Sequence, residues 1–301
     1  MKLVLVVHCV DAEGPLGGDA RRNDDGTPEF FDTWPAILAS LNDLTTPKSR
    51  DKRQDSYGNP WVFSWFTLDF QGFATNPKCR DTTPHCVYDK LGTLDTSGDG
   101  FYFHHHAVPE SGAGDEWADE WNPEPAEEQL DRMWRERGRR PFVFRAGGTI
   151  ENNDLSHWLD DEGFTVDFSN RVSERSRPDS GLYDFSWFGA PSRWGSYQPS
   201  WDNFLEPGGA GRHVYRCIDL RSRYNELTDA HVDEAFTQTN AENRPAVLSF
   251  FSHDNRDMRS ETKHAYKLIA AGAKRHGIPW RISTAVGAHR IYQDAQLAVA
   301  A

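Results

Sequence analysis

The feature that most constrains the fold is the alternation of short apolar runs with amphipathic segments along the whole chain. The apolar runs, which have the length of buried strands, lie near residues 4–10, 61–66, 101–103, 141–144, 164–168, 213–220, 246–251 and 280–286. Amphipathic helices are expected near residues 33–44, 124–137, 155–163, 229–240 and 260–277. Strands and helices that alternate in this way predict an α/β fold, a parallel sheet of about seven to eight strands closed into a distorted (β/α) barrel.

The length of the chain fits this architecture. A chain of 301 residues with 37% hydrophobic content is long for an ordinary domain but usual for an α/β barrel. We predict one catalytic barrel domain over residues 1–301, with loop insertions around 71–100 and 169–211. A structureless loop as long as the second insertion is usually functional or covering, so we expect it to form a lid or a wall over a site. Its tryptophans, Trp194 and Trp201 among them, are hydrophobic cover or stack on sugar rings.

Polar side chains follow four of the predicted strands at the point where each strand ends. They are Asp11 and Glu13 after the first, His104, His105 and His106 after the third, Arg145 after the fourth, and His253 and Asp254 after the seventh. The carboxyl ends of parallel barrel strands open onto one face, and active sites lie there. We therefore expect these side chains to meet.

The histidine run has the spacing of a metal site. Two residues apart on an extended segment, His104 and His106 point the same way and can bind one ion, while His105 faces the opposite side. A carboxylate would complete a set of two histidines and one acid, with open positions for water and substrate. This arrangement is typical of metal-assisted hydrolysis.

Either acid of the first strand can complete that set, and the other can then serve as general base. If the backbone stays regular through Ala12, Asp11 and Glu13 both point to the same side as Cys9, and their distances to the histidines decide the assignment. Arg145 either pairs structurally with an acid near the rim or orients the catalytic base. We favour the second role.

Charge and hydropathy exclude several classes of partner. The net charge is −13, and no block of Lys or Arg is long enough to track a phosphate backbone. No apolar run could span a bilayer, and His8 and Asp11 interrupt the first run too early for a signal-peptide core. We predict a cytoplasmic protein with no nucleic-acid partner and no membrane insertion.

The four cysteines are too few and too scattered for a disulfide framework. Cys79 and Cys86 lie in a polar loop, where a metal pair or a disulfide is conceivable. Free thiols are the preferred interpretation.

The strand-end motifs, taken in order, resemble those of a known family. They are Asp-Ala-Glu-Gly-Pro (11–15), His-His-His (104–106), Phe-Arg-Ala-Gly (144–147) and Leu-Ser-Phe-Phe-Ser-His (248–253). This order resembles the polysaccharide deacetylase family, the NodB-like carbohydrate esterases, over nearly the whole chain, although each motif is short. The resemblance implies a NodB-like glycoside hydrolase/deacetylase barrel and a hydrolase that uses one divalent ion, with zinc expected, to remove an acyl group, usually acetyl, from an amino sugar.

The resemblance also implies roles for individual residues. Asp11 matches the general base, Arg145 the residue that orients it, and His253 the general acid. The metal ligands would be Glu13, His104 and His106. We further expect Trp194, Trp201 and Asp254 to contact the substrate.

Two departures indicate a divergent branch of the family. Ala12 separates the two acids, which are adjacent in the family, so the roles of Asp11 and Glu13 could be exchanged. The histidines are two apart, whereas the family spaces them four apart. The leading hypothesis is a metal-dependent hydrolase acting on a carbohydrate or glycan precursor. The alternatives are a glycosidase on the same barrel and a carbohydrate-binding barrel without turnover.

Overall fold

The computed structural model describes residues 1–15, 30–68, 86–106, 123–138, 140–149, 151–172, 187–220 and 227–300. Its strands are β1 (Val4–Ala12), β2 (Ser64–Thr67), β3 (Gly100–His105), β4 (Val143–Ala146), β5 (Val166–Asn170), β6 (Ser196–Tyr197), β7 (His213–Asp219), β8 (Ala246–His253) and β9 (Trp280–Ile282). Its helices are α1 (Trp34–Thr45), α2 (Pro47–Asp51), α3 (Cys86–Leu91), α4 (Glu124–Arg137), α5 (Asn153–Asp161), α6 (Asp229–Glu242), α7 (Met258–His276) and α8 (Ala285–Ala300), with a 3-10 turn, η2 (Gly147–Thr149).

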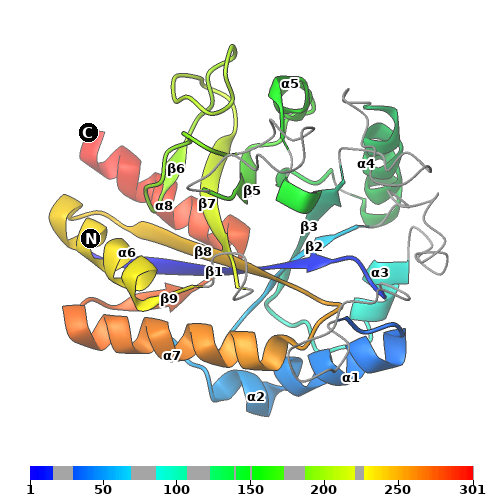
Figure 1. Ribbon diagram of the computed structural model, residues 1–301, viewed down its shortest axis with the longest axis horizontal. Helices are drawn as coiled ribbons and strands as arrows, with labels where there is room; N and C mark the ends of the chain where they lie inside the picture. Colours follow the sequence, from blue (N-terminus) through cyan, green and yellow to red (C-terminus); the bar gives the residue numbers. More distant parts are fainter. Residues whose placement is uncertain are drawn as a thin grey trace.

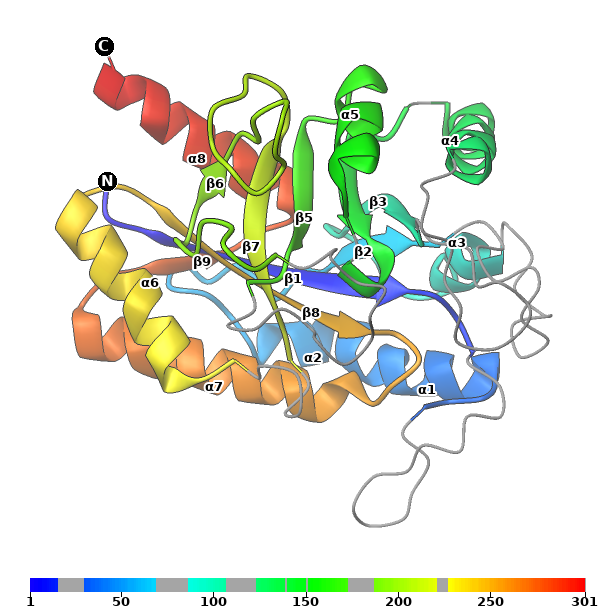
Figure 2. The ribbon, with the colours of Figure 1, turned by 45° about the horizontal axis from the view of Figure 1, so that its top comes forward.

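Seven parallel strands close the barrel, in the order β1, β2, β3, β4, β5, β7, β8 and back to β1. The first strand contacts three others, because its amino-terminal end also pairs with β9, outside the ring. The two-residue strand β6 pairs antiparallel with β7. Figures 1 and 2 show β1 at the centre of the molecule, with α1, α6 and α7 along one side of the sheet. The predicted (β/α) barrel is confirmed.

The side chains of β1 point alternately to two hydrophobic clusters, one on each face of the strand. Leu5, Val7 and Cys9 belong to the cluster that fills the barrel. Val6 and Val10 belong to the cluster between the sheet and its outer helices. All nine residues of the strand are buried, as expected for a parallel strand covered on both faces. Because side chains alternate regularly to the end of β1, this alternation determines which way Asp11 and Glu13 point.

Helix α8 packs against the interior cluster of the barrel. Ala285, Ala288 and Tyr292 of this helix join the interior residues. The Nδ1 atom of His289 lies 2.9 Å from the hydroxyl of Tyr215 on β7. The helix was not expected from the sequence, where residues 280–286 are a single predicted strand. Strand β9 ends at Ile282, and the helix begins three residues later.

The insertion at 169–211 was expected to form a lid or a wall over a site, and its described residues pack on the outside of the barrel. Trp187, Tyr197 and Phe204 pack with Val214, a β7 residue whose side chain points away from the barrel interior. This segment lies between β5 and β7 in the chain, where the other strand pairs of a (β/α) barrel have a helix. Its described residues 187–211 therefore form a wall on the outside of the barrel.

Three smaller features complete the fold. Asp257 caps α7, because its side chain accepts the N–H of Arg259. The insertion at 71–100 contains α3, and its residues 71–85, with Cys79, lie outside the described part of the chain. The segment at 47–60 contains α2 and the buried Arg50. No described helix combines the length and the hydropathy of a membrane span.

Arg50 joins α2 to the start of β3. Its guanidinium donates to both carboxylate oxygens of Asp99 at 2.7 Å and to the carbonyl oxygen of Trp61 at 2.8 Å. The Asp99 side chain is fully buried, and its carboxylate also accepts the N–H of Phe63. The pair therefore holds the segment before β2 against the segment before β3.

Removing this cation should destabilise the protein strongly. We expect Arg50→Met to lower the free energy of unfolding by about 3–5 kcal/mol, because it leaves a buried carboxylate unpaired. Urea unfolding measures the change. The control is Arg275→Met, whose side chain is 42% exposed in its ion pairs, and which should cost less than about 1 kcal/mol. Equal effects of the two substitutions would contradict this account.

Candidate metal centre

The register of the barrel strands brings the polar strand ends together. In the β1 and β8 pairing, Asp11 lies opposite His253. In the β3 and β4 pairing, His104 lies opposite Arg145. The predicted convergence of these four residues at the carboxyl ends of the strands is therefore observed.

Asp11 and Arg145 form a buried two-point ion pair. The Arg145 Nε atom donates to Asp11 Oδ1 at 2.6 Å, and its NH2 group donates to Oδ2 at 3.1 Å. A third bond runs to the carbonyl oxygen of Phe168 at 2.6 Å, and the guanidinium carbon lies 3.6 Å from the ring centroid of Phe251. Burial alone would lower the pKa of Arg145, but Asp11 raises it above its ordinary value. The guanidinium is therefore a fixed cation that orients the Asp11 carboxylate.

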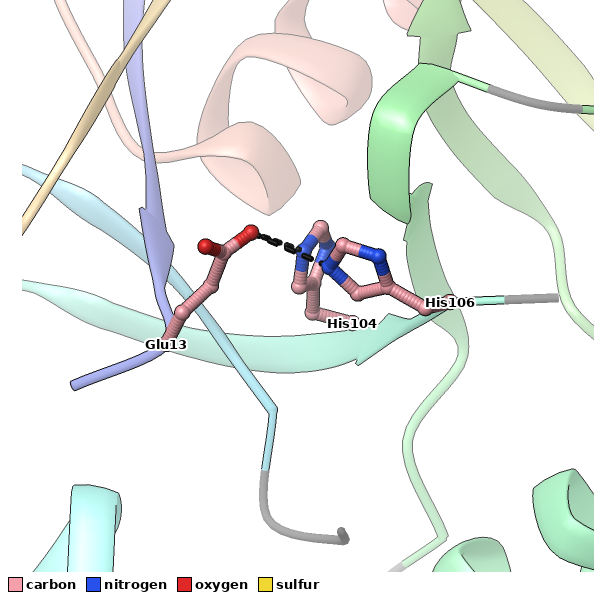
Figure 3. A group of neighbouring side chains, drawn as sticks. All are labelled: Glu13, His104 and His106. Atoms are coloured by element: carbon pink, nitrogen blue, oxygen red, sulfur yellow. Dashed lines mark hydrogen bonds and ion pairs between the residues drawn. The ribbon is translucent and has the colours of Figure 1, made fainter. Parts of the chain in front are cut away.

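Glu13 faces the two inward histidines (Figure 3). Its Oε1 atom lies 3.0 Å from His106 Nε2 and 3.4 Å from His104 Nε2. Burial alone would raise the pKa of Glu13, but its hydrogen bonds with the two histidines hold that pKa well below its usual value. Glu13 is therefore an ionised carboxylate that can bind a cation together with two imidazoles.

The structure separates the two acids by their distances to the histidines. Strand β1 stays regular through Ala12, so Asp11 and Glu13 both point into the barrel. The Oδ1 atom of Asp11 lies 4.0 Å from His104 Nδ1, the nitrogen that is already 2.8 Å from the Arg145 carbonyl oxygen. The Glu13 carboxylate lies against the Nε2 atoms instead. This geometry assigns the ligand position to Glu13 and leaves Asp11 for another role.

His105 points away from the centre, as its place in the strand predicts. Its Nδ1 atom lies 2.8 Å from Oε1 of Gln129 on α4. The Gln129 amide also donates to the His104 carbonyl oxygen at 2.7 Å. Burial lowers the pKa of His105 to about 4, so the ring is neutral at pH 7. Gln129 thus supports the strand that carries both candidate ligands.

Asp254, a predicted substrate contact, instead holds the loop that carries Glu13. Its fully buried carboxylate accepts the backbone N–H of Glu13 at 3.0 Å and that of Gly14 at 3.1 Å. The Asp254 N–H donates in return to the Asp11 carbonyl oxygen at 3.1 Å. Burial raises the pKa of Asp254 to about 7, although these backbone donors oppose the rise. Asp254 is therefore a positioning residue in this structure.

The two predicted sugar-stacking tryptophans contact the outer helices α6 and α5. Trp194 is fully buried, and its indole N–H donates to Glu234 on α6 at 2.9 Å. Its carbonyl oxygen accepts the N–H of Val247, at the end of β8 opposite to His253. Trp201 is 59% exposed and stacks on His157 of α5 at a centroid distance of 3.8 Å. The geometry favours the alternative of hydrophobic cover for Trp194.

Two polar residues were missed although they directly follow the predicted His253 and Asp254. The Nδ2 atom of Asn255 donates to Glu13 Oε2 at 3.4 Å. The NH2 group of Arg256 lies 3.1 Å from His253 Nδ1. An unbroken polar run after an apolar strand was the available signal, but the sequence does not show which of its members turn inward.

The residues present fit a divalent ion such as zinc. The donor atoms of Glu13, His104 and His106 all lie within 4.8 Å of one another. Two ligand atoms that bind one tetrahedral zinc at about 2.0–2.1 Å are about 3.3 Å apart. The Glu13 Oε1 atom lies 3.0 Å and 3.4 Å from the two histidine Nε2 atoms. The bond from His104 Nδ1 to the Arg145 carbonyl oxygen directs Nε2 to the ion. Three protein ligands leave a fourth position open, as in catalytic zinc sites.

Known proteins similar to this chain are found by comparing structures and not by comparing sequences. No family model and no curated protein matches the sequence. Puue allantoinase is similar in structure, with a TM-score of 0.52 and 14% identity over 97% of this chain and 90% of that chain. A protein assigned as a polysaccharide deacetylase from Mycobacterium smegmatis gives 0.47 and 14% identity, over 98% and 91% of the two chains. A protein assigned as a glycoside hydrolase/deacetylase from Parabacteroides distasonis gives 0.48 and 12% identity, over 94% and 69%. The similarity to the allantoinase shows a shared barrel fold.

The assignment of Glu13 rather than Asp11 as ligand can be tested by zinc titration. We expect Glu13→Gln to weaken zinc binding by more than about 100-fold, because changes outside the ligand shell alone cost about 10–100-fold. Asp11→Asn and His105→Asn should each cost no more than about 10–100-fold, because neither side chain supplies a ligand atom. Isothermal titration of the metal-stripped protein gives the affinities. A larger loss in Asp11→Asn than in Glu13→Gln would reverse the assignment.

Proposed function

We propose that this chain is a zinc-dependent amide hydrolase that removes an acetyl group from an amino sugar, as a divergent member of the polysaccharide deacetylase family. The observation that carries the proposal is that two groups of side chains lie side by side at the carboxyl ends of the barrel strands. A carboxylate with two imidazoles can hold an ion, and a second carboxylate, fixed by Arg145, lies beside them. The strand-end motifs and the barrel fold support the same family. The cytoplasmic location stays a prediction from the sequence.

Each residue of the centre has a role in this reaction. Glu13, His104 and His106 would hold the ion, which when bound polarises the acyl carbonyl and the attacking water. Asp11 takes a proton from that water as general base. Arg145 fixes the direction of the Asp11 carboxylate through two bonds. The resemblance gives His253, whose Nε2 atom is 3.8 Å from Asp11 Oδ2, a part in protonating the leaving nitrogen.

The electrostatics of the rim do not favour a glycosidase. A glycosidase needs one carboxylic acid with a raised pKa to protonate the leaving oxygen. The pKa of Glu13 is lowered by its histidines, and Asp11 forms a two-point ion pair with a guanidinium. Glu13 is therefore suited to the ionised state, and the Asp11 carboxylate is bonded to Arg145. Asp254, whose pKa burial raises to about 7, is fully buried, and its carboxylate is bonded to the backbone of the Glu13 loop. The name of the allantoinase suggests a second candidate within amide hydrolysis, a small cyclic amide such as allantoin.

Product analysis tests the proposal. The zinc-loaded protein should release free acetate from N-acetylated chitooligosaccharides and leave their chain length unchanged. Asp11→Asn should lower the rate by about 100- to 10,000-fold, the usual contribution of a general base, and should still bind zinc. Turnover of allantoin without acetate release would favour the cyclic amide. Shortened sugar chains, or sugar binding without any product, would contradict the proposal.

The orienting role of Arg145 can be tested separately. Arg145→Lys keeps a positive charge but loses the two-point contact, so we expect kcat to fall by about 100-fold through misplacement of Asp11. Zinc affinity should fall far less than in Glu13→Gln, because the Arg145 side chain is not a ligand. Initial rates at saturating substrate, with zinc titration as the control, measure both effects. An unchanged kcat would show that orientation by the guanidinium is unnecessary.

A further inference from the structure

Gly147, the residue that follows β4, lies directly against the ring of the candidate ligand His106. The last pair of the β3 and β4 ladder is His105 with Ala146. His106 and Gly147 are therefore the next residues along the two segments. A Cβ atom added to Gly147 would lie 2.6 Å from the His106 Nε2 atom and closer still to two carbons of the ring. Non-bonded carbon atoms prefer separations of about 3.5–4.0 Å, so the observed position of the ring leaves no room for a side chain at 147.

The two-residue spacing of the histidines makes this space necessary. Residues two apart on an extended chain are separated by about 6.6 Å. The ring centroids of His104 and His106 are only 5.2 Å apart, with their planes at 86°, so the two rings lean toward each other. Their Nε2 atoms thereby reach the same Glu13 oxygen, at 3.4 and 3.0 Å (Figure 3). In this position the ring of His106 lies over the backbone of Gly147.

Hydrogen bonds hold the backbone on both sides of Gly147. The N–H of Ala146 donates to the hydroxyl of Ser169 on β5 at 2.8 Å. The carbonyl oxygen of Thr149 accepts the indole N–H of the buried Trp187 at 2.9 Å. Because these bonds oppose a shift of the backbone, the His106 ring is the part that would have to move. Gly147 itself is outside the left-handed region, so alanine is compatible with its backbone angles.

We propose that Gly147 is a positioning residue, which gives the His106 ring the space from which it can bind an ion together with His104 and Glu13. A side chain at 147 would turn the His106 ring away from Glu13 and leave the ion with two protein ligands. The consequence for catalysis rests on the proposed function. The two-residue histidine spacing of this chain is thus matched by a glycine on the neighbouring segment.

Crystal structures of the metal-free full chain and of its Gly147→Ala variant test this placement without reference to zinc or to activity. In the unchanged chain, we expect the His106 Nε2 atom at hydrogen-bond distance from Glu13 Oε1, as observed here at 3.0 Å. In Gly147→Ala, the added methyl group should displace the ring and break this contact. A Gly147→Ala structure in which His106 still contacts Glu13 would overturn the proposal.

Zinc titration of single and double variants shows whether Gly147 acts through His106. We expect Gly147→Ala and His106→Ala each to weaken zinc binding by more than about 100-fold, because both remove the same ligand from the centre. In a chain that already carries His106→Ala, adding Gly147→Ala should change the affinity by less than about tenfold, because the ring that the methyl group would displace is absent. A further loss of about 100-fold in the double variant would overturn the proposal.

The matched control is Gly195→Ala, whose added methyl group would meet the hydroxyl of Tyr292 on α8. It should leave both the zinc affinity and the position of His106 unchanged, and a loss as large as that of Gly147→Ala would contradict the specific role of Gly147. If Gly147→Ala fails to fold, the double variant with His106→Ala should fold, and its failure would refute the proposal. Absence of zinc binding by the unchanged chain would count against the proposed metal centre only, because the metal-free crystal structures still decide the placement of His106.

Discussion

The structure depends on the pairing of β1 with three other strands. This strand closes the ring between β8 and β2, and its amino-terminal end also holds β9. The same register places Asp11 opposite His253. Because side chains alternate along a strand, a slip of one residue would turn Asp11 and Glu13 out toward the helices. The strand register that closes the barrel is therefore also the register that brings the polar strand ends together.

The buried charges of the rim are stable only because each has a partner. Asp11 is paired with Arg145, and Glu13 with His104 and His106. Breaking a buried pair by removing one member costs about 3–5 kcal/mol, so these groups fix one another before any ligand binds. Backbone N–H groups bonded to Asp254 hold the Glu13 loop in the same way. The rim is thus preorganised by the protein's own contacts.

The strands, the inward histidine pair and the convergence of four strand ends could be predicted from the sequence. Their signals are local, since apolar runs mark strands and period-two alternation places His104 and His106 together and His105 apart. The choice between Asp11 and Glu13 needed distances across the barrel. The contacts of Asn255 and Arg256 depend on the path of the chain after β8, and a polar run has no periodicity that reveals such a path.

Two further differences come from tertiary context. Helix α8 begins soon after β9, with small residues such as Ala285 and Ala288 facing the barrel interior, so its apolar face is weak in the sequence. The 187–211 segment is aromatic but irregular, and nothing in its composition shows that it packs on the outside of the barrel. Burial of Trp194 within this part of the fold likewise could not be read from its place in a loop.

The most direct measurement is anomalous diffraction from crystals of the protein grown with zinc. The account predicts one strong peak per chain, within bonding distance of Glu13, His104 Nε2 and His106 Nε2, with Asp11 still bonded to Arg145. A peak bonded to Asp11 with Glu13 turned away would contradict the assignment of the ligands. Absence of any peak among these residues at saturating zinc would contradict the metal centre itself.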